Sequence, residues 1–429
     1  MPTSSRQDTH RRRSSSVTAA LNQIPLNQQG DGIRPLRVKS HPSFSPVVAP
    51  GLGTPSKVKA RPLSRRYVSD GLWSDVKTGK WLLIPSSSFK LSLIAPILYL
   101  LHVSLAYAGV EAFQPGGQIP NIGEKCLLPS NEQDGGYAKT WWDVALLVHY
   151  IVFWTFVRQF MTLKVLAPLA FKLGVRGGKI TRFTEQGYAV FYYGIYVTYG
   201  LYVMRSLPTW YYKTEYFFID YPHKIISFRL KFYYLTQWAF WAQQTIILAA
   251  KVEKPRKDYK ELVLHHIVTI WLIFWSYMAH FTYFGVAIFF TMDTSDLFFS
   301  LAKCVNYLSD FWSIPFLVWF TISWTYLRHY LNLLILYNFP TQYDLIPVAA
   351  RSKIDFYNDS YLDSYGFMKW QIFIPIAALQ ALNLFWYFLI LRILVRAVWN
   401  WGEDVKDDRS EDEDEGEEEL EEVAGKKKE

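Results

Sequence analysis

The chain has 429 residues, a formal net charge of +8 and a hydrophobic content of 51%, including 17 Trp, 29 Tyr and 30 Phe. The apolar residues come in blocks of about 20 separated by basic or turn-rich linkers, a pattern typical of transmembrane helices rather than soluble domains. Positive charge beside such blocks is explained by insertion topology, so it does not indicate a nucleic-acid partner. The composition predicts an all-α polytopic membrane protein.

Residues 1–80 precede the first apolar block and are rich in Ser, Pro, Gly and Arg. Such a segment cannot bury enough apolar surface to offset the entropy of ordering, so we expect a disordered, basic, cytosolic N-terminal region without a cleavable signal peptide. The motifs RRRSSS at 11–16 and SRRYVS at 64–69 are typical of basophilic kinase sites, which makes Ser15 and Ser69 candidates for phosphorylation. The alternative is that these charges only hold the N-terminus in the cytosol.

Eight apolar blocks follow, and we interpret each as a membrane span. Their predicted bounds are 91–110, 141–173, 186–204, 232–250, 261–280, 283–301, 312–337 and 370–398. An even number of spans places the short basic linkers, the basic N-terminal region and Lys303 on one side of the membrane. Because cytosolic loops carry the excess of Lys and Arg, both termini are then cytosolic.

The tail after residue 401 is acidic, and a block of like charge repels itself and favours disorder. Ser410 stands before an acidic run and resembles an acidophilic kinase site. Lys426 and Lys427 occupy the fourth and third positions from the end, which resembles the dilysine signal that returns membrane proteins to the endoplasmic reticulum. These features predict a multi-pass protein of the endoplasmic reticulum membrane.

The span 261–280 carries ionisable residues at a depth where charge is expensive. A charge at a bilayer centre costs ~3 kcal/mol or more, so such residues face a protein interior or a wet cavity and are functional candidates. Glu261, His265 and Thr269 recur every four residues and share one helix face. We expect the imidazole of His266 to point in a different direction from that of His265.

In the next span, Asp293 and Asp296 share a face that continues through Ser300 to Lys303. A tight connection near Phe281 makes the two spans antiparallel neighbours. Both polar faces then meet in the cytosolic half of the bilayer, and the sequence predicts a polar pocket there that opens toward the cytosol.

Imidazole can act as a general base or, beside a carboxylate, as a nucleophile, and a carboxylate can hold a substrate ammonium. Transfer of an acyl group from a cytosolic donor to a lipid amine would use these groups together. Gln244 and Arg328 belong to other spans and are candidates for lining the same cavity. We expect Arg328 past the midpoint toward the lumen, where it could pair with a carboxylate or contact the polar end of a lipid.

Three other interpretations of these residues remain open. A histidine in a membrane span is often only a packing residue with a hydrogen bond. A metal site is the second, although the nine His are scattered and only one pair is adjacent. A proton-coupled transporter is the third, although the two halves of the chain show no repeat.

Two motifs together resemble a known family signature. They are RKDYKELVLHHIVT at 256–269 and MDTSDLFFSLAKCVNYL at 292–308. The pair is similar to the signature of ceramide synthases, the enzymatic branch of the TLC-domain families, and its second motif resembles the fungal members. The resemblance covers about residues 181–400, which divides the chain into 1–80, 81–180, a TLC catalytic domain at 181–400 that forms a helical bundle around a lipid-accessible pocket, and 401–429.

The resemblance implies N-acylation of a sphingoid long-chain base by fatty acyl-CoA, which is a co-substrate, with no cofactor and no metal. His265 and His266 become the catalytic pair, and Asp293 and Asp296 the essential acidic pair. The candidates for substrate binding are Glu261, Thr269, Ser300, Arg328 and Gln244. The candidates for holding CoA phosphates are Arg176, Lys179, Lys254, Arg256 and Lys257.

The resemblance also implies partners, namely membrane lipids, a small single-span regulatory subunit and a second ceramide synthase chain in a homo- or heterodimer. Two chemical routes remain open. In one, a histidine deprotonates the sphingoid amine for direct attack, and in the other it first takes the acyl group as an acyl-imidazole. A non-catalytic TLC-domain protein that binds or regulates lipids is the main alternative function.

Overall fold

A computed structural model describes residues 68–399 of the chain, apart from 176, 253–256, 352–353, 357 and 364–365. Of the predicted site residues, Ser15, Ser410, Arg176, Lys254 and Arg256 lie outside the described residues, as does the dilysine-like end. Every described residue belongs to one compact unit.

The described unit is almost entirely helical. Its longer helices are α3 (Pro85–Ser92), α4 (Ile94–Tyr107), α6 (Trp142–Phe160), α8 (Lys179–Arg205), α9 (Phe228–Ala249), α10 (Tyr259–Met278), α11 (Thr282–Leu308), α12 (Asp310–Trp324), α13 (Asn332–Gln342) and α14 (Phe367–Trp399). Shorter helices are α2 (Leu72–Lys77), α5 (Ile122–Leu127) and α7 (Ala167–Lys172). Two π-helical segments, Met161–Leu166 and Thr325–Leu331, join α6 to α7 and α12 to α13.

The connections contain short 3₁₀ turns at Lys80–Leu82, Glu111–Phe113, Trp210–Tyr212, Thr214–Phe217, Tyr343–Leu345 and Val348–Ala350. The two strands β1 (Glu132–Gln133) and β2 (Gly136–Tyr137) form an antiparallel hairpin in which Glu132 faces Tyr137. Tyr137 also bridges to Ile226, just before α9. We call the end of the bundle that carries this hairpin the hairpin end, and the end where α8 begins and α11 ends the far end.

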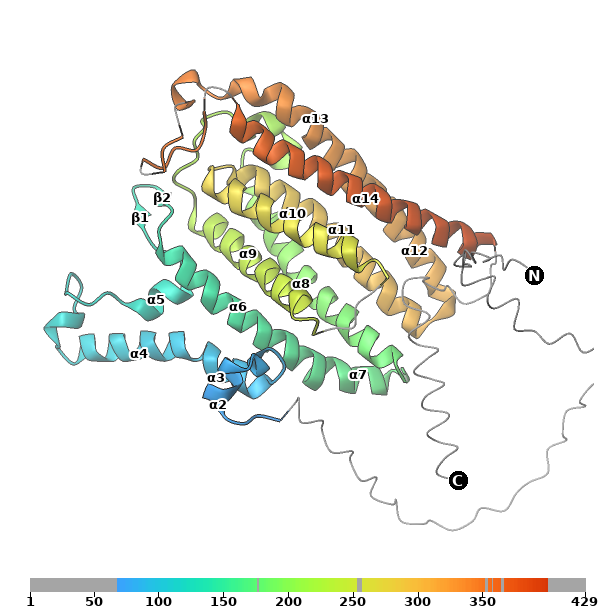
Figure 1. Ribbon diagram of the computed structural model, residues 1–429, viewed down its shortest axis with the longest axis horizontal. Coiled ribbons are helices and arrows are strands. Elements are labelled where there is room, and N and C mark those ends of the chain that lie inside the picture. Colours follow the sequence, from blue (N-terminus) through green and yellow to red (C-terminus); the bar gives the residue numbers. More distant parts are fainter. Residues whose placement is uncertain are drawn as a thin grey trace, which may run out of the picture. The chain divides into compact units, whose positions relative to one another are not determined.

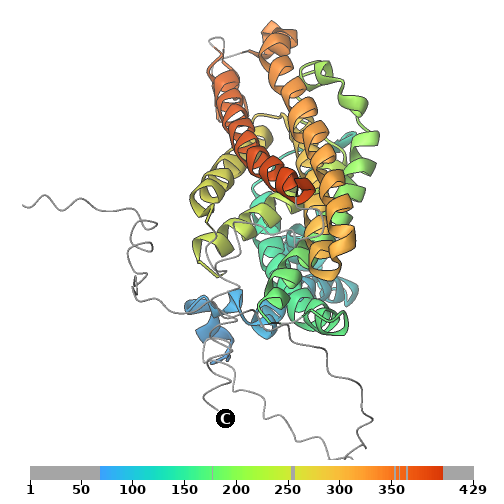
Figure 2. The same cartoon turned by 90° about the vertical axis from the view of Figure 1, so that its right-hand side faces the viewer.

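From α6 onward the helices form a bundle in which successive long helices run antiparallel, with α6–α7 and α12–α13 each continuous through a π-helical segment (Figures 1 and 2). Helix α11 lies inside this bundle, with α8, α10 and α12 packed against it. Helix α4 lies apart from the bundle core, and α3 packs on α6. The predicted antiparallel pairing of the spans 261–280 and 283–301 is therefore present as α10 and α11.

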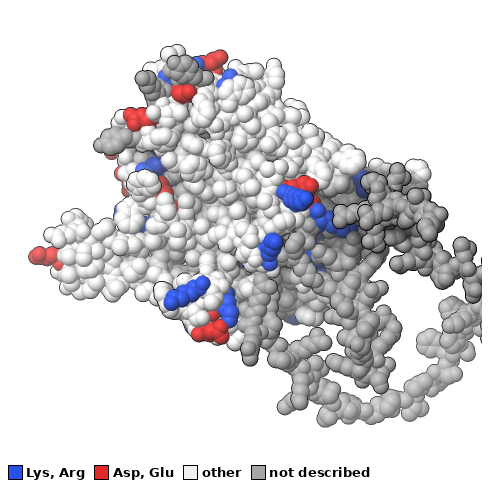
Figure 3. Space-filling model, viewed as in Figure 1, with Lys and Arg blue, Asp and Glu red and all other residues white. Residues whose placement is uncertain are grey.

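The outer surface is that of a multi-pass membrane protein. Leu100 and Leu101 on α4 are 60% and 53% exposed, and similar apolar side chains cover the outer faces of α12 and α14. Figure 3 shows a broad uncharged surface with Lys, Arg, Asp and Glu gathered in small groups. An apolar surface of this extent needs a lipid or protein partner.

Five helical stretches are long and apolar enough to cross a membrane, namely Pro85–Tyr107, Trp142–Lys172, Tyr259–Met278, Thr282–Leu308 and Phe367–Trp399. The other three predicted spans coincide with the helices α8, α9 and α12–α13, which carry more polar residues. Length and composition thus establish a multi-pass helical protein, and the count of eight spans stays a prediction.

The residues before the first predicted span contain more ordered structure than the sequence indicates. Part of the predicted disordered region 1–80 forms α2, and the side chain of Asp75 in this helix is fully buried. Composition does not predict this order because polar contacts of Asp75 with Ser69, Asp70 and Ser87, rather than a large apolar core, hold the segment in place.

Aromatic side chains fill the core between α8 and α9. Tyr188, Tyr192 and Tyr196 recur every four residues on α8, so they share one face, and all three are buried. At Gly200, one turn further on, a Cβ atom would lie 2.7 Å from the hydroxyl oxygen of Tyr233 on α9. The absent side chain at Gly200 therefore allows the Tyr233 ring to pack against α8.

A buried ion pair joins helices at the hairpin end. The Lys231 ammonium on α9 lies 2.8 Å from the Asp143 carboxylate on α6, and both side chains are almost completely buried. Lys231 also donates to the backbone carbonyls of Ser130 and Ala138, and Tyr277 on α10 donates to Asp143. Because the polar atoms of this ammonium are satisfied, the pair can hold α6, α9, α10 and the hairpin in one arrangement.

A second polar cluster at the same end fixes the loop that precedes α14. Asp359 in this loop accepts hydrogen bonds from Lys139 at 2.8 Å and from His280 at 2.9 Å, and Lys139 also donates to the carbonyl of Met278. Partial burial alone would raise the pKa of Asp359, but the hydrogen bonds from His280 and Lys139 lower it to about 2. The carboxylate thus stabilises the fold above the usual carboxyl pKa of about 4, and this contribution is lost only as the pH falls through about 2.

The close approach at Gly200 gives a test of this packing. Gly200→Ala should lower the free energy of unfolding by about 1–3 kcal/mol, because the new methyl group meets the Tyr233 hydroxyl. Gly194→Ala on the same helix is the matched control, since a Cβ there has no neighbour within 4 Å. It should stabilise the helix by about 0.5–1 kcal/mol. Thermal unfolding in detergent micelles measures both, and equal effects would contradict this description of the interface.

Candidate active site

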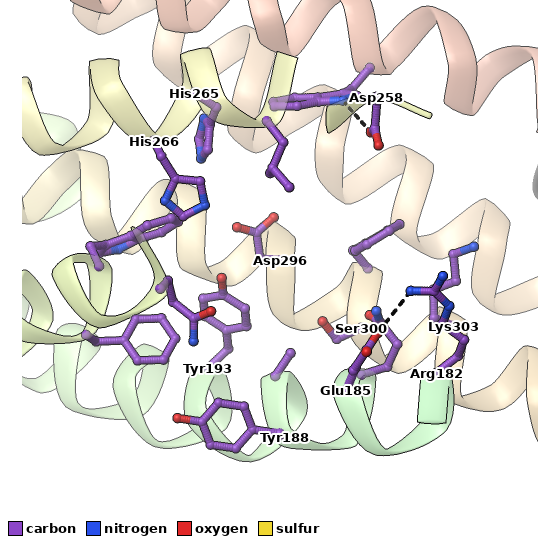
Figure 4. A pocket seen from close by; sticks show the side chains of 18 of the residues that line it. Arg182, Glu185, Tyr188, Tyr193, Asp258, His265, His266, Asp296, Ser300 and Lys303 are labelled. Atoms are coloured by element: carbon purple, nitrogen blue, oxygen red, sulfur yellow. Dashed lines mark hydrogen bonds and ion pairs between the residues drawn. The ribbon is translucent and has the colours of Figure 1, made fainter. Parts of the chain in front are cut away.

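A cavity of about 300 Å³ lies inside the bundle, toward the far end. We call it the polar chamber. Side chains of α6, α8, α9, α10, α11, the second π segment and α14 line it, and they include Arg158, Arg182, Tyr193, Trp241, Gln244, Asp258, Leu262, His265, His266, Asp296, Ser300, Lys303, Arg328 and Trp386. Figure 4 shows His265, His266 and Asp296 facing one another across it.

His265 projects from α10 into the chamber between two indole rings. The ring centroids of Trp241 and Trp386 lie 5.7 Å and 5.4 Å from that of His265. The side chain is buried, and its Nδ1 atom has no hydrogen-bond partner among the residues that the structure describes. An unpartnered buried nitrogen is costly in a structural residue, so it is a reason to assign His265 a chemical role.

His266 lines the same chamber, contrary to the expectation that the two imidazoles diverge. Its Nδ1 atom is hydrogen-bonded to the Thr245 hydroxyl at 3.1 Å, and its ring centroid lies 5.8 Å from that of His265. Successive residues of a helix are separated by about 100° around its axis. Both imidazoles reach the chamber because the chamber faces the side of α10 that lies between them.

The same geometry corrects the predicted position of Glu261. With the chamber-facing side centred between the two histidines, Asp258 and Leu262 fall on it, and Glu261 lies about 90° away and is absent from the chamber lining. Asp258 is buried and accepts a hydrogen bond from the indole of Trp386 at 3.2 Å. The acidic residue that faces the chamber at the start of α10 is thus Asp258 rather than the predicted Glu261.

Asp296 forms an ion pair with Arg328, with its Oδ1 atom 2.5 Å from the guanidinium. Tyr193 of α8 contributes a further hydrogen bond to this carboxylate. Arg328 also donates to the Ser295 hydroxyl, to the Asn383 side chain at 2.9 Å and to the Met292 carbonyl. The guanidinium therefore has partners from α11 and α14, which hold it in one position.

Arg328 lies at the level of Asp296, which corrects its predicted place nearer the lumen. It belongs to the π-helical segment Thr325–Leu331, and its guanidinium lies 4.2 Å from the ring centroid of Trp324. Helical side chains point toward the N-terminus of their helix, and the long arginine side chain reaches back in that direction. Pairing with a carboxylate is the part of the prediction that the structure bears out.

Asp293 lies behind the chamber rather than in it. It is fully buried, and its Oδ2 atom accepts a hydrogen bond from Gln237 of α9. Gln237 in turn accepts from Tyr192 and donates to Tyr233. Asp293 and Asp296 are only about 60° apart around α11, yet the first meets α9 while the second meets the chamber.

A smaller apolar pocket of about 40 Å³ continues from the chamber toward the hairpin end. Trp241, His265, Asp296 and Arg328 line both spaces. Apart from these four, the pocket wall is mainly apolar, and Thr269 belongs to it rather than to the chamber. His265 therefore stands where a polar space meets an apolar one.

The other predicted residues divide between the chamber and the outside. Ser300 and Gln244 line the chamber, whereas Lys179 and Lys257 do not. Besides Arg328, three cations line it that were not predicted as CoA ligands, namely Arg158 on α6, Arg182 on α8 and Lys303 on α11. Arg182 is paired with Glu185 at 3.3 Å. Arg158 could have been identified from the sequence, because it is a charged residue inside the predicted span 141–173.

The part of the chain that the structure describes contains no group of three or more His, Cys, Asp or Glu side chains that could hold a metal ion. The polar groups around the chamber include two imidazoles, the carboxylate of Asp296 paired with an arginine, the carboxylate of Asp258, and indole rings. This set suits proton transfer and nucleophilic chemistry.

Comparison with known proteins identifies the family. Residues 182–392 match the model of the TLC domain. A sphingosine N-acyltransferase of Schizosaccharomyces pombe, lac1, is 40% identical over 65% of this chain and 71% of its own. The ceramide synthase LAG1 of Saccharomyces cerevisiae is 37% identical over 82% of this chain and 83% of its own. The chain belongs to the ceramide synthase family. The resemblance of the two sequence motifs to this family is thereby confirmed.

In this ceramide synthase, the Arg328–Asp296 pair gives a test of the site's construction. Removing one partner of a buried pair leaves a charge without compensation, so Arg328→Met should lower the free energy of unfolding by about 3–5 kcal/mol. The double variant Arg328→Met/Asp296→Asn should be more stable than the single one, because the unpaired carboxylate is gone. Unfolding in detergent measures the difference, and a strictly additive loss would contradict a direct pair.

Proposed function

We propose that this chain is an active ceramide synthase that N-acylates a sphingoid long-chain base, such as sphinganine or phytosphingosine, with fatty acyl-CoA. The observation that carries the proposal is the position of His265 at the junction of the polar chamber and the apolar pocket. A fatty acyl thioester has the same division, with a polar carrier on one side of its reactive carbonyl and an apolar chain on the other.

This division supports the following position for the bound donor. The first carbons of its acyl chain occupy the apolar pocket beyond His265, and its thioester carbonyl lies among His265, His266 and Asp296. Its phosphates lie nearer the far end, where Arg158, Arg182 and Lys303 line the chamber. Phosphate groups are bound well by arginine because its planar fork donates two parallel hydrogen bonds. Glu185, which pairs with Arg182, would be displaced or would hold that side chain in place.

The catalytic roles follow from the partners of each side chain. His265 is the nucleophile: the ring nitrogen that carries no proton attacks the thioester carbonyl, the C–S bond breaks, and the departing thiolate takes the proton that the acylated imidazole gives up and leaves as CoA thiol. The uncharged amine of the sphingoid base then attacks the acyl-imidazole, and the C–N bond to the ring breaks as the amide forms. His266, fixed by Thr245, accepts the proton that the amine loses, and the departing ring nitrogen of His265 takes up that proton.

Asp296 and Arg328 have a supporting role in this scheme. The carboxylate, held between Arg328 and Tyr193, orients the entering amine, and Arg328 keeps that carboxylate from facing the apolar interior without a partner. Asp293 acts through Gln237 and the packing of α9 and is a positioning residue. Thr269 lies along the acyl chain, and Ser300 and Gln244 lie along the donor.

The location of the protein is part of the proposal. Eight spans with both termini in the cytosol, in the endoplasmic reticulum membrane, place the far end and its three chamber cations on the cytosolic side. A water-soluble CoA ester reaches the chamber from there, while the sphingoid base enters from the bilayer. A single-span regulatory subunit and a second synthase chain are proposed partners on the basis of the family resemblance, and the divisions at residues 80, 180 and 400 belong to the same proposal.

The covalent route is tested with purified protein and acyl-CoA alone. We expect one burst of free CoA and a mass increase of one acyl group, located on His265 by peptide mass spectrometry. His265→Ala should abolish both the burst and ceramide formation. His266→Ala should keep the burst and slow the transfer to the amine, because only proton removal is affected. A burst without an adduct, or turnover by His265→Ala, would contradict the covalent route.

The donor position is tested with a shortened substrate. Arg158→Gln and Arg182→Gln should each raise the KM for acyl-CoA about tenfold, because one charge-assisted contact to a phosphate is lost. Both variants should leave the KM for the matching acyl-pantetheine, which has no phosphate, close to that of the unaltered enzyme. Lys172→Gln, a charge loss on the exposed end of α7, is the control. If Lys179→Gln and Lys257→Gln raise the KM for acyl-CoA more than these variants do, the phosphates bind instead at the residues predicted from the sequence.

A further inference from the structure

An exposed serine at the edge of the described unit is hydrogen-bonded to a buried carboxylate. The hydroxyl of Ser69 donates to Asp75 Oδ2 at 2.6 Å, and the hydroxyl of Ser87 donates to the same oxygen at 2.5 Å. Asp75 is fully buried, whereas Ser69 is exposed. We call these three residues the Asp75 cluster. It joins the segment before α2 to the first turn of α3.

The Asp75 cluster is connected to the wall of the polar chamber. Ser88, next to Ser87 on α3, donates to the side chain of Gln159 on α6 at 3.2 Å, and Gln159 donates to the carbonyl of Trp81 at 3.2 Å. Gln159 is buried and adjacent in sequence to Arg158, a chamber cation. The turn of α6 that presents Arg158 is thus held by α3 and the 3₁₀ turn before it.

Ser69 also has the sequence context of a modification site. Arg65 and Arg66 precede it by four and three residues, a spacing that basophilic protein kinases recognise. Of the three candidate phosphorylation sites in the sequence, Ser69 is the one within the described residues. Its exposure leaves the hydroxyl within reach of an enzyme.

We propose that phosphorylation of Ser69 by a basophilic protein kinase releases α2 and α3 from α6 and thereby weakens binding of the acyl donor at the polar chamber. In the modification, the Ser69 oxygen forms a bond to the terminal phosphorus of ATP, ADP leaves, and the hydroxyl proton passes to the kinase. This inference rests on the proposed function for its activity readout alone.

The physical reason is that phosphorylation turns the attractive contact between Ser69 and Asp75 into a repulsive one. The unmodified hydroxyl donates a hydrogen bond to the Asp75 carboxylate, whereas a phosphate has no such proton and carries a charge of about −2 near neutral pH. Two anions a few ångström apart in a partly buried site repel one another. Among the described residues, Lys80 is a cation close to Asp75, and it already pairs with Asp70. The segment before α2 must therefore move away from Asp75, and Ser87 remains as the one side-chain donor of the cluster.

Hydrogen–deuterium exchange of the full-length protein tests the structural part. After treatment with a basophilic kinase and ATP, mass spectrometry should find phosphate on Ser69, and peptides covering residues 80–92 and 155–166 should exchange faster. An unmodified Ser69 after exhaustive treatment, or slower exchange because Lys80 captures the phosphate and tightens the segment, would overturn the proposal. This readout needs no catalysis, so it stands even where the proposed function fails.

Kinetics of charge variants test the functional part. Ser69→Glu should raise the KM for acyl-CoA about fivefold with little change in kcat, because donor binding rather than chemistry is affected. Ser86→Glu, which adds the same charge at an exposed position of α3, is the matched control and should leave KM unchanged.

The double variant Ser69→Glu/Asp75→Asn removes the repulsion and should recover most of the loss in donor affinity. Asp75→Asn alone keeps neutral hydrogen bonds to Ser69 and Ser87 and should have a smaller effect than Ser69→Glu. Equal KM values for the Ser69→Glu and Ser86→Glu variants, or no recovery in the double variant, would show that repulsion from Asp75 does not affect binding of the acyl donor in the chamber.

Discussion

A buried arginine in an apolar bundle constrains everything around it. The guanidinium of Arg328 has five N–H groups to satisfy in a space where water is scarce, and it meets this need with a carboxylate, an amide, a hydroxyl and a backbone carbonyl from α11 and α14. These partners fix how α11, α14 and the π segment lie against one another. The same contacts set the position of Asp296, so the geometry of the candidate site and the packing of the bundle come from one set of hydrogen bonds.

Much of this arrangement could be predicted from the sequence, because hydropathy and helical periodicity act locally. The apolar blocks predicted the helices, and the adjacent placement of α10 and α11 followed from their short connection. The pairing of the region of His265 with that of Asp296 followed as well. What periodicity could not supply was the angle at which α10 presents its face. A rotation of less than a quarter turn decides that His266 and Asp258 reach the chamber and that Glu261 does not.

The remaining differences have a similar origin in tertiary contacts. Asp293 and Asp296 are equivalent by helical spacing, but Gln237 of α9 takes up the first, and the second is left facing the cavity. The chamber cation Arg158 comes from a helix outside the matched TLC domain, so motifs within that domain could not reveal it. The folded segment around Asp75 depends on hydrogen bonds from Ser69 and Ser87, which lie six and twelve residues away from it. Amino-acid composition contains no information about such pairs.

The hydroxyl of Tyr233 links two properties that are usually treated as separate. It lies where the missing side chain of Gly200 leaves room, and it also accepts a hydrogen bond from Gln237, the residue that holds Asp293. The spacing of α8 and α9 and the hydrogen bonding of Asp293 beside the candidate site thus depend on one oxygen atom. Members of this family are therefore expected to vary Gly200, Tyr233, Gln237 and Asp293 together.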